Sequence, residues 1–295
     1  MNQKQYDIMK NGKGFIAALD QSGGSTPKAL KTYGVDESEY AGEREMFEKV
    51  HEMRKRIITS PSFTNDEIVG VILFEETMYS HIENLFSADY LWDIKKIVPF
   101  LKVDQGKEEK ANGVQLMSEM PELEKMLESA NDRNIFGTKM RSVILEYNEK
   151  GIEDIVKQQF EVAKRILKFD LMPILEPEID IHAKDKAKIE EKMLEEIKKN
   201  LDTLEEGQEI MFKLSPPEKA NFYKDLVEDD RVLRVVFLSG GHSREKANEL
   251  LAENNGVIAS FSRGFTQGLH VDQSKEEFDD MIAKSAKKIY EASIT

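Results

Sequence analysis

The sequence predicts a closed (β/α)₈ barrel that occupies residues 1–295 as a single domain. Short apolar runs alternate along the chain with longer charged segments of helical period, and most runs end in a polar or charged residue. At 295 residues and 40% hydrophobic content the chain can bury a core of that size, and no Pro/Gly/Ser-rich linker divides it. The apolar runs are Gly14–Asp20, Ile68–Phe74, Ile97–Asp104, Phe136–Met140, Leu171–Glu178, Glu209–Ser215, Val232–Ser239 and Val257–Arg263.

Each apolar run is followed by a segment with helical period. Eight strand-like runs that alternate with helices favour a closed barrel over an open doubly wound sheet. The fourth run is short, and a long segment separates the first run from the first helical segment. The bounds of these two elements are therefore the least defined. The helical segments are Glu37–Ile58, Ala88–Lys96, Pro121–Asn134, Gly151–Phe169, Ala183–Leu204, Pro217–Asp229, Ser243–Asn254 and Lys275–Ala292.

Composition excludes several classes of function. A formal charge of -14 and an isoelectric point near 5.0 oppose nonspecific binding to nucleic acid or to anionic membranes. The absence of cysteine excludes disulfides and thiolate nucleophiles. The amino-terminal stretch lacks the apolar core of a signal peptide, and no run approaches the ~18 apolar residues of a membrane span. We therefore expect a cytoplasmic protein, in which any anionic ligand needs a locally basic pocket.

Charged side chains gather where the predicted strands end. In a parallel barrel these ends form one rim, and active sites of this fold are built there. The alternative is that each cation only neutralises a neighbouring carboxylate. The two interpretations are compatible, because a polyionic site needs internal partners when it is empty. The residues at the strand ends are Asp20, Glu75, Glu76, Lys102, Asp104, Lys139, Arg141, Glu176, Glu178, Lys213, Ser239 and Arg263.

One lysine interrupts the apolar run EIMFKLS at residues 209–215. Strand alternation places Ile210, Phe212 and Leu214 on one face and Lys213 on the other. Desolvation disfavours the charged form of a buried lysine and leaves more free amine, the nucleophile needed for Schiff-base formation with a ketone. A lysine paired with a carboxylate in an ionic core is the alternative.

Two carboxylates stand two residues apart in LEPEID, so Glu176 and Glu178 share one strand face. Such a pair can supply the acid and the base that a lysine-dependent carbonyl reaction needs. A divalent metal site is the alternative, although no H-x-H or H-x-x-x-H pair supports zinc. No dinucleotide or ATP motif is present, so we expect neither a cofactor nor a metal.

Glycine- and serine-rich turns follow three of the runs. Such turns present backbone amides and hydroxyls to an anion, and the loops after strands seven and eight of these barrels frequently bind phosphate. Two such cradles on one rim predict a substrate with two phosphates, whereas ordinary capped loops are the alternative. The candidate residues are Ser22 and Ser25 after the first run, Ser239, Gly240 and Gly241 after the seventh, and Ser262 and Arg263 at the end of the eighth.

Seven motifs, taken together and in order, resemble those of class I fructose-bisphosphate aldolases. They are GKGFIAALDQSGGSTPKAL, FLKVDQG, FGTKMRS, PILEPEI, MFKLSPP, VVFLSGGHSREKAN and SFSRG, and they extend from about Gly12 to Gly264. The resemblance implies a (β/α)₈ barrel that reversibly cleaves fructose 1,6-bisphosphate into dihydroxyacetone phosphate and glyceraldehyde 3-phosphate. The family uses no metal and forms a Schiff base on a lysine.

The resemblance also implies residue roles. Lys213 is the expected Schiff-base lysine, Glu176 the principal proton shuttle and Asp20 the group that acts on the C4 hydroxyl. Lys139 and Glu178 are expected beside Lys213. The expected substrate-binding residues are Arg141, which places the substrate, Ser239, Gly240, Ser262 and Arg263 at the phosphate nearest the ketone, and Ser22, Ser25 and Lys102 at the other phosphate.

The sequence departs from the animal enzymes at three places. Gln21 replaces an acidic residue, Ser262 replaces a glycine, and the tail tyrosine that handles the enamine proton has no counterpart, because Tyr290 reads as a packing residue. The chain therefore looks more like a bacterial member, with the enamine proton donor unassigned. A tagatose-bisphosphate aldolase or another Schiff-base aldolase, a metal-dependent aldolase and a noncatalytic phosphosugar-binding barrel remain alternatives. Relatives are often homo-oligomers.

Overall fold

A computed structural model describes residues 1–295 and confirms the closed (β/α)₈ barrel. The strands pair in the order β5, β2, β1, β11, β10, β9, β8, β7, and a parallel pairing of β5 with β7 closes the cylinder. Eight parallel strands form the barrel: β1 (Phe15–Leu19), β2 (Ile68–Leu73), β5 (Val98–Lys102), β7 (Gly137–Ile144), β8 (Met172–Ile179), β9 (Ile210–Leu214), β10 (Val232–Phe237) and β11 (Ile258–Phe261).

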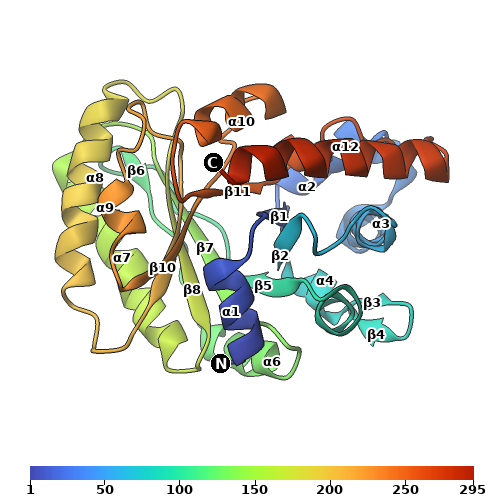
Figure 1. The fold of residues 1–295 in the computed structure, drawn as a ribbon, viewed down its shortest axis with the longest axis horizontal. Helices are drawn as coiled ribbons and strands as arrows, with labels where there is room; N and C mark the ends of the chain where they lie inside the picture. The colour runs from blue at the N-terminus through green and yellow to red at the C-terminus, as the bar shows by residue number, and fades with distance from the viewer.

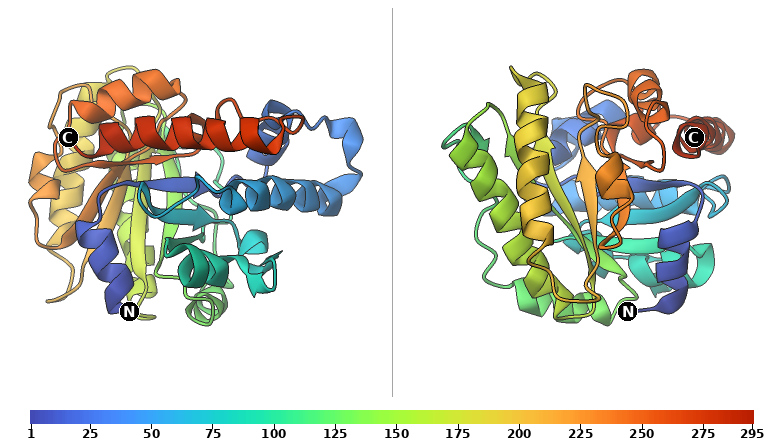
Figure 2. Two further views of the ribbon diagram at one scale, coloured as in Figure 1. Left: turned by 45° about the vertical axis from the view of Figure 1, so that its right-hand side comes forward. Right: turned by 60° about the vertical axis from the view of Figure 1, so that its left-hand side comes forward.

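Helices cover the outside of the barrel (Figure 1). They are α1 (Gln3–Asn11), α2 (Ser25–Tyr33), α3 (Gly42–Thr59), α4 (Glu75–Tyr79), α5 (Ser87–Asp89), α6 (Leu123–Asn131), α7 (Glu149–Leu167), α8 (Lys186–Leu201), α9 (Lys224–Val227), α10 (Arg244–Ala252), α11 (Arg263–Thr266) and α12 (Lys275–Ser293). Helices α7 and α8 pack side by side on one flank, and α10 packs against the long α12 on another (Figure 2). None of the helices combines the length and the apolar character that crossing a membrane requires.

Small elements complete the chain. The short strand β6 (Val114–Gln115) pairs antiparallel with β7, and β3 (His81–Ile82) forms a two-stranded hairpin with β4 (Leu85–Phe86). A 3₁₀ turn, η1 (Glu37–Glu39), precedes α3, and a π-helical turn, η2 (Tyr90–Lys95), continues α5.

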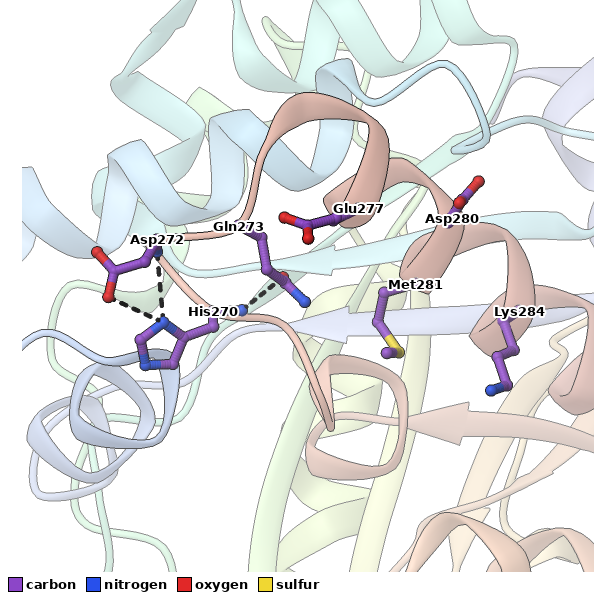
Figure 3. A pocket seen from close by; sticks show the side chains of 7 residues that line it. All are labelled: His270, Asp272, Gln273, Glu277, Asp280, Met281 and Lys284. Carbon is purple, nitrogen blue, oxygen red and sulfur yellow. Dashed lines mark hydrogen bonds and ion pairs between the residues drawn. The ribbon is translucent and has the colours of Figure 1, made fainter.

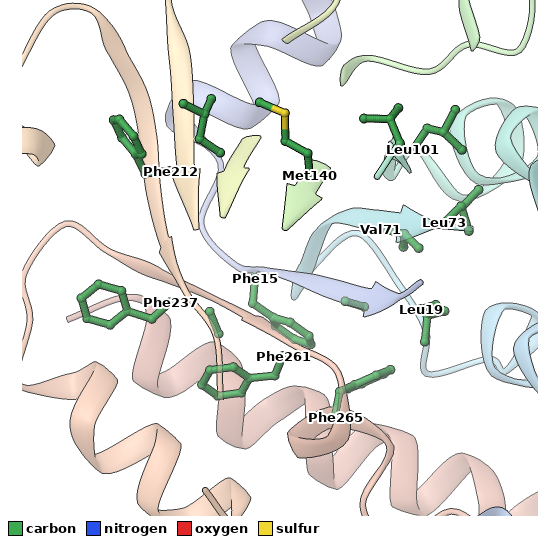
Figure 4. Packing of buried hydrophobic residues seen from close by; sticks show 14 of the residues in the cluster. Phe15, Leu19, Val71, Leu73, Leu101, Met140, Phe212, Phe237, Phe261 and Phe265 are labelled. Atoms are coloured by element: carbon green, nitrogen blue, oxygen red, sulfur yellow. The ribbon is translucent and has the colours of Figure 1, made fainter. Parts of the chain in front are cut away.

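The two faces of each barrel strand serve different purposes. On β9, Ile210, Phe212 and Leu214 join the large apolar core under the helices, as the alternation predicts. Figure 4 shows Phe212 in this outer layer together with labelled side chains from β1, β2, β10 and β11. Met211 instead belongs to a smaller apolar cluster inside the barrel, so the same face of β9 carries Lys213 into the mouth.

Helix α1, which the sequence analysis did not predict, covers the amino-terminal end of the barrel. Asn2 caps it by accepting hydrogen bonds from the Lys4 and Gln5 amides. Met9 is fully buried within the inner apolar cluster, and Arg234 on β10 donates hydrogen bonds to the Met9 and Lys10 carbonyls at 3.0 and 2.7 Å. The barrel is thus plugged at this end, and its polar mouth lies at the other.

The other differences from the predicted elements are local. Strand β7 continues beyond Met140 to Ile144, because its pairing with β8 stays in register as far as Ile179. Helix α2 begins at Ser25, before the first predicted helical segment. Pro27 is its third residue, a position where its missing N–H costs no helical bond. Only α9 is helical within 217–229.

Candidate active site

Lys213 lies inside the barrel mouth and is 4% exposed. Strand β9 places it beside β8, and its Nζ lies 3.1 Å from Oε1 of Glu176. Glu176 is itself buried, because it occupies the inward face of β8 above Ile174 of the inner cluster. The sequence therefore places this amine and this carboxylate correctly on neighbouring strands.

Lys139 on β7 is the centre of the charged mouth. Its Nζ lies 2.6 Å from Oδ2 of Asp20 and 3.1 Å from Oε2 of Glu176, and 3.9 Å from Oδ2 of Asp104. Asp20 forms no ion pair with Lys213 directly. The four side chains instead form a continuous series of contacts from Asp20 through Lys139 and Glu176 to Lys213.

The buried charges of this series shift one another. Burial alone would raise the pKa of Asp20, but Lys139 and Lys213 outweigh it and hold this pKa well below its usual range. Burial likewise favours protonated Glu176, but the same two lysines lower its pKa. Burial would lower the pKa of Lys139, but Asp20 and Glu176 raise it far above the ordinary lysine range. Asp20 and Glu176 are therefore carboxylates and Lys139 is an ammonium at neutral pH.

Asp104 joins this cluster more closely than the sequence indicates. Its carboxylate accepts a hydrogen bond from the Arg141 amide at 3.1 Å, and its Oδ1 lies 2.8 Å from Lys102 Nζ. The sequence places Asp104 among the charged residues of the predicted rim and as a partner for its cations, but assigns it no catalytic or binding role. Its position two residues after Lys102 in FLKVDQG is the signal that could have marked it as part of the site.

Glu178, which the resemblance places beside Lys213, pairs with Arg141 in the structure. Its Oε2 lies 2.5 Å from Nε of Arg141, and no ion pair joins it to Lys213. Burial would lower the pKa of Arg141, but Glu178 outweighs it and raises this pKa above its usual range. The pair lies nearer the outer edge of the mouth, since the Arg141 side chain is 39% exposed.

The turn after β10 and the start of α11, which the sequence predicts to form a phosphate cradle, lie close together. Gly240 and Gly241 both have positive φ, at 57° and 106°, and the His242 amide bonds to the Ser239 carbonyl at 2.8 Å. A Cβ on Gly241 would lie 3.4 Å from Nη2 of Arg263, so the exposed guanidinium lies over this turn.

The turn after β1 is folded on itself. The Ser22 amide donates to Ser25 Oγ at 3.1 Å, and this hydroxyl donates to the Ser22 carbonyl at 2.8 Å. A Cβ added at Gly23 or Gly24 would meet nothing within 4 Å, so the turn faces open space. The Ser22, Ser25 and Thr26 amides already donate hydrogen bonds within the turn, and no hydrogen bond joins the turn to Lys102.

A separate surface hollow lies along α12 and is lined by none of the predicted site residues (Figure 3). Asp272, Glu277 and Asp280 contribute three carboxylates to it, against one lysine, Lys284. Such a surface disfavours a phosphorylated ligand. The mouth of the barrel remains the candidate site. No group of three or more His, Cys, Asp or Glu side chains is arranged there, or elsewhere, to hold a metal ion.

The described geometry defines a (β/α)₈ barrel whose mouth holds a buried lysine in contact with a carboxylate. A family model described as fructose-bisphosphate aldolase class-I matches residues 1–212. This chain therefore belongs to the class-I fructose-bisphosphate aldolase family, whose members are lyases.

Two solved structures share the fold. Fructose-bisphosphate aldolase from Plasmodium falciparum, solved with TRAP and a small-molecule inhibitor, aligns with a TM-score of 0.76 at 19% identity, over 98% of this chain and 92% of that chain. An archaeal fructose-1,6-bisphosphate aldolase, whose catalytic Lys is covalently bound to the carbinolamine intermediate of the substrate, aligns with a TM-score of 0.53 at 12% identity. That alignment covers 98% of this chain and all of the archaeal one.

Proposed function

We propose that this protein reversibly cleaves fructose 1,6-bisphosphate into dihydroxyacetone phosphate and glyceraldehyde 3-phosphate through a Schiff base on Lys213. The contacts from Lys213 through Glu176 and Lys139 to Asp20 carry this proposal. They place one amine and two ionised carboxylates side by side in a buried mouth, which is the set of groups that this reaction needs.

The first half of the reaction forms the Schiff base. Glu176 accepts a proton from the Lys213 ammonium, 3.1 Å away, and the free amine adds to the C2 ketone. Proton transfer from nitrogen to oxygen gives a neutral carbinolamine. Glu176 then returns its proton to the carbinolamine hydroxyl, water leaves, and the iminium remains on Lys213. The C2-bound nitrogen is now an electron sink for the adjacent carbon–carbon bond.

The second half breaks the bond between C3 and C4. The Asp20 carboxylate accepts the proton of the C4 hydroxyl, the C4 carbonyl forms, and the electron pair of the broken bond moves to the iminium as an enamine. Lys139, at 2.6 Å, keeps Asp20 in the accepting form at neutral pH. Protonation of the enamine at C3 and addition of water then release dihydroxyacetone phosphate and restore the Lys213 amine.

The remaining groups hold the substrate in this proposal. Ser239, Gly240, Gly241, Ser262 and Arg263 hold the phosphate nearest the ketone. Ser22, Ser25 and Lys102 hold the other phosphate, and Arg141, fixed by Glu178, places the chain between them. We further propose that residues 1–295 act as one catalytic domain of the bacterial type, without a cofactor, in glycolysis or gluconeogenesis in the cytoplasm, and that the protein forms a homo-oligomer.

Replacement of the nucleophile tests the proposed function. Lys213→Met removes the amine and keeps an unbranched side chain, so cleavage of fructose 1,6-bisphosphate should fall to background. The control Lys246→Met changes an exposed lysine on α10 and should retain wild-type turnover. Turnover by Lys213→Met near the wild-type rate would refute the assignment. Binding of the bisphosphate by the wild-type protein without turnover would instead favour a noncatalytic sugar-binding barrel.

Two further assays separate the rival aldolases. Comparison of fructose and tagatose 1,6-bisphosphates distinguishes the C4 epimers, and we expect the fructose epimer to be cleaved faster. A metal-dependent aldolase loses activity when a chelator is added, and we expect no loss here.

A further inference from the structure

Arg54 on α3 carries a buried positive charge that no carboxylate contacts. Its side chain is completely buried, Nη1 donates to Thr77 Oγ1 at 2.6 Å, and Nη2 donates to the Gln21 carbonyl. The third nitrogen, Nε, has no hydrogen-bond partner. Every partner of this guanidinium is therefore neutral.

A buried cation of this kind is unusual. Burial lowers the pKa of Arg54 to about 10, so the guanidinium still carries its charge at neutral pH. Buried charges are normally compensated by a contacting opposite charge, because their desolvation is otherwise costly. Asp20 and Glu76 act on Arg54 only from beyond ion-pair distance. An anion that arrives at the adjacent rim would supply the missing compensation.

Gln21 connects this cation to the candidate phosphate turn. Its Oε1 lies 3.4 Å from Arg54 Nη2, and its Nε2 donates to Ser262 Oγ at 2.7 Å. Because Ser262 Oγ accepts this bond, its own proton is directed elsewhere, and no protein acceptor takes it. Ser262 immediately precedes Arg263. The hydroxyl proton is thus available to a ligand at this turn.

We propose that Arg54, Gln21 and Ser262 form a polarised relay that presents the Ser262 hydroxyl as a donor to a substrate phosphate beside Arg263. Arg54 and Gln21 are positioning residues, because they act through Ser262 and need not touch the ligand. This proposal rests on the proposed function in one respect, which is that the bound phosphate belongs to a sugar bisphosphate. Gln21 and Ser262 are also two of the three departures from the animal enzymes, and in the structure they contact each other.

A carboxylate at position 21 would reverse the relay. Gln21→Glu replaces the donor to Ser262 with an acceptor, so the Ser262 proton turns toward Glu and away from the ligand. The new carboxylate also pairs with Arg54 and repels phosphate. Phosphate binding should therefore weaken, while the free protein becomes no less stable because its buried cation is now compensated.

The experiment compares the full-length wild-type protein with Gln21→Glu. We expect the KM for fructose 1,6-bisphosphate and the inhibition constant of inorganic phosphate each to rise about tenfold, the scale of one charge-assisted hydrogen bond. We expect kcat to stay within about twofold and the Tm without ligand not to fall. Inorganic phosphate should raise the Tm of the wild type more than that of the variant.

Gln3→Glu is the matched control, because it adds the same charge at an exposed position on α1, at the end of the barrel opposite the mouth. We expect its KM and its phosphate inhibition constant to match the wild type. Equal weakening of phosphate binding in both variants would overturn the relay and indicate a general charge effect. An unchanged phosphate inhibition constant in Gln21→Glu would also overturn the relay. A fall in Tm of Gln21→Glu together with its affinity would indicate a merely structural role.

A double-mutant cycle tests the hydrogen bond between Gln21 and Ser262. If the relay acts as one unit, Gln21→Met with Ser262→Ala should lose no more phosphate affinity than the weaker-binding single variant. Independent effects that multiply would contradict it. The phosphate-dependent rise in Tm needs no turnover, so the relay can be confirmed even if the wild type does not cleave fructose 1,6-bisphosphate.

Discussion

At the scale of single residues, the charged side chains of the mouth share their ion-pair partners. Glu176 contacts Lys213 through one carboxylate oxygen and Lys139 through the other. Lys139 also holds Asp20, so this one ammonium faces both proposed proton-transfer groups. A change at any of these side chains should therefore alter the ionisation of the others.

Glu176→Gln should lower kcat by roughly 10²- to 10⁴-fold, because it removes the proton shuttle beside Lys213 while keeping the shape of the side chain. Steady-state cleavage of fructose 1,6-bisphosphate measures this. We expect Glu191→Gln, a change on the exposed face of α8, to leave kcat unchanged. A kcat of Glu176→Gln within threefold of wild type would remove Glu176 from its proposed role.

The sequence predicts the strand residues that point into the mouth, but not the helix residues that support the mouth from outside the barrel. Lys213, Glu176 and Lys139 end apolar strands, and strand alternation assigns them to one face. Arg54 lies in the run HEMRKRIITS beside two other basic residues. Only helical period distinguishes it from them, because it stands four residues after Val50 and four before Ile58 on the buried stripe of α3. Its burial arises from the packing of α3 against the loop after β1, which is a long-range contact.

At the scale of elements, the eight strands could be predicted because each apolar run is short and bounded by polar residues. Helix α1 was missed because its sequence, QKQYDIMKN, is mostly polar and only Gln5 and Met9 are buried. Pairing with β8 extends β7 beyond Phe136–Met140, the apolar run that predicts this strand. Tertiary contacts thus decide the elements whose local pattern is weak.

Helix α1 provides a test of the barrel plug. Met9→Ala should lower the free energy of unfolding by roughly 2 to 5 kcal/mol, because it leaves a cavity in the inner apolar cluster. Urea denaturation measures this, with exposed Lys4→Ala as a control expected to change it by less than ~0.5 kcal/mol. A Met9→Ala protein as stable as Lys4→Ala would show that α1 does not plug the barrel.

At the scale of the whole molecule, the strongly acidic chain buries a small group of its basic side chains in one mouth. The protein carries a formal charge of -14. In the mouth, Lys102, Lys139, Arg141 and Lys213 pair with Asp104, Asp20, Glu178 and Glu176, so these charges cancel. Arg263 adds positive charge beside the turn after β10, whereas Glu75 and Glu76 after β2 add negative charge to the rim. Attraction of a phosphate is therefore local to the turn beside Arg263.

The buried carboxylates should make the fold sensitive to acid. The pKa values of Asp20 and Glu176 are lower in the folded protein than in the unfolded chain, so their stabilising contribution is present above the unfolded values, near pH 4. It is lost as the pH falls through the folded values. The free energy of unfolding of the wild type should therefore decline below about pH 4.

Urea titrations of wild type and Asp20→Asn at several pH values check this. The variant should be less stable than wild type at pH 7, because Lys139 loses its carboxylate partner at 2.6 Å. The difference should shrink on acidification as Asp20 itself becomes protonated. A difference that stays constant down to pH 2 would contradict the depressed pKa of Asp20.

Covalent trapping of Lys213 is the most direct test of the account. The protein is mixed with dihydroxyacetone phosphate, reduced with borohydride, digested and analysed by mass spectrometry. We expect the reduced triose phosphate adduct on the peptide that contains Lys213, and no adduct on Lys102 or Lys139. An adduct on either of those lysines, or none on the wild-type protein, would contradict it.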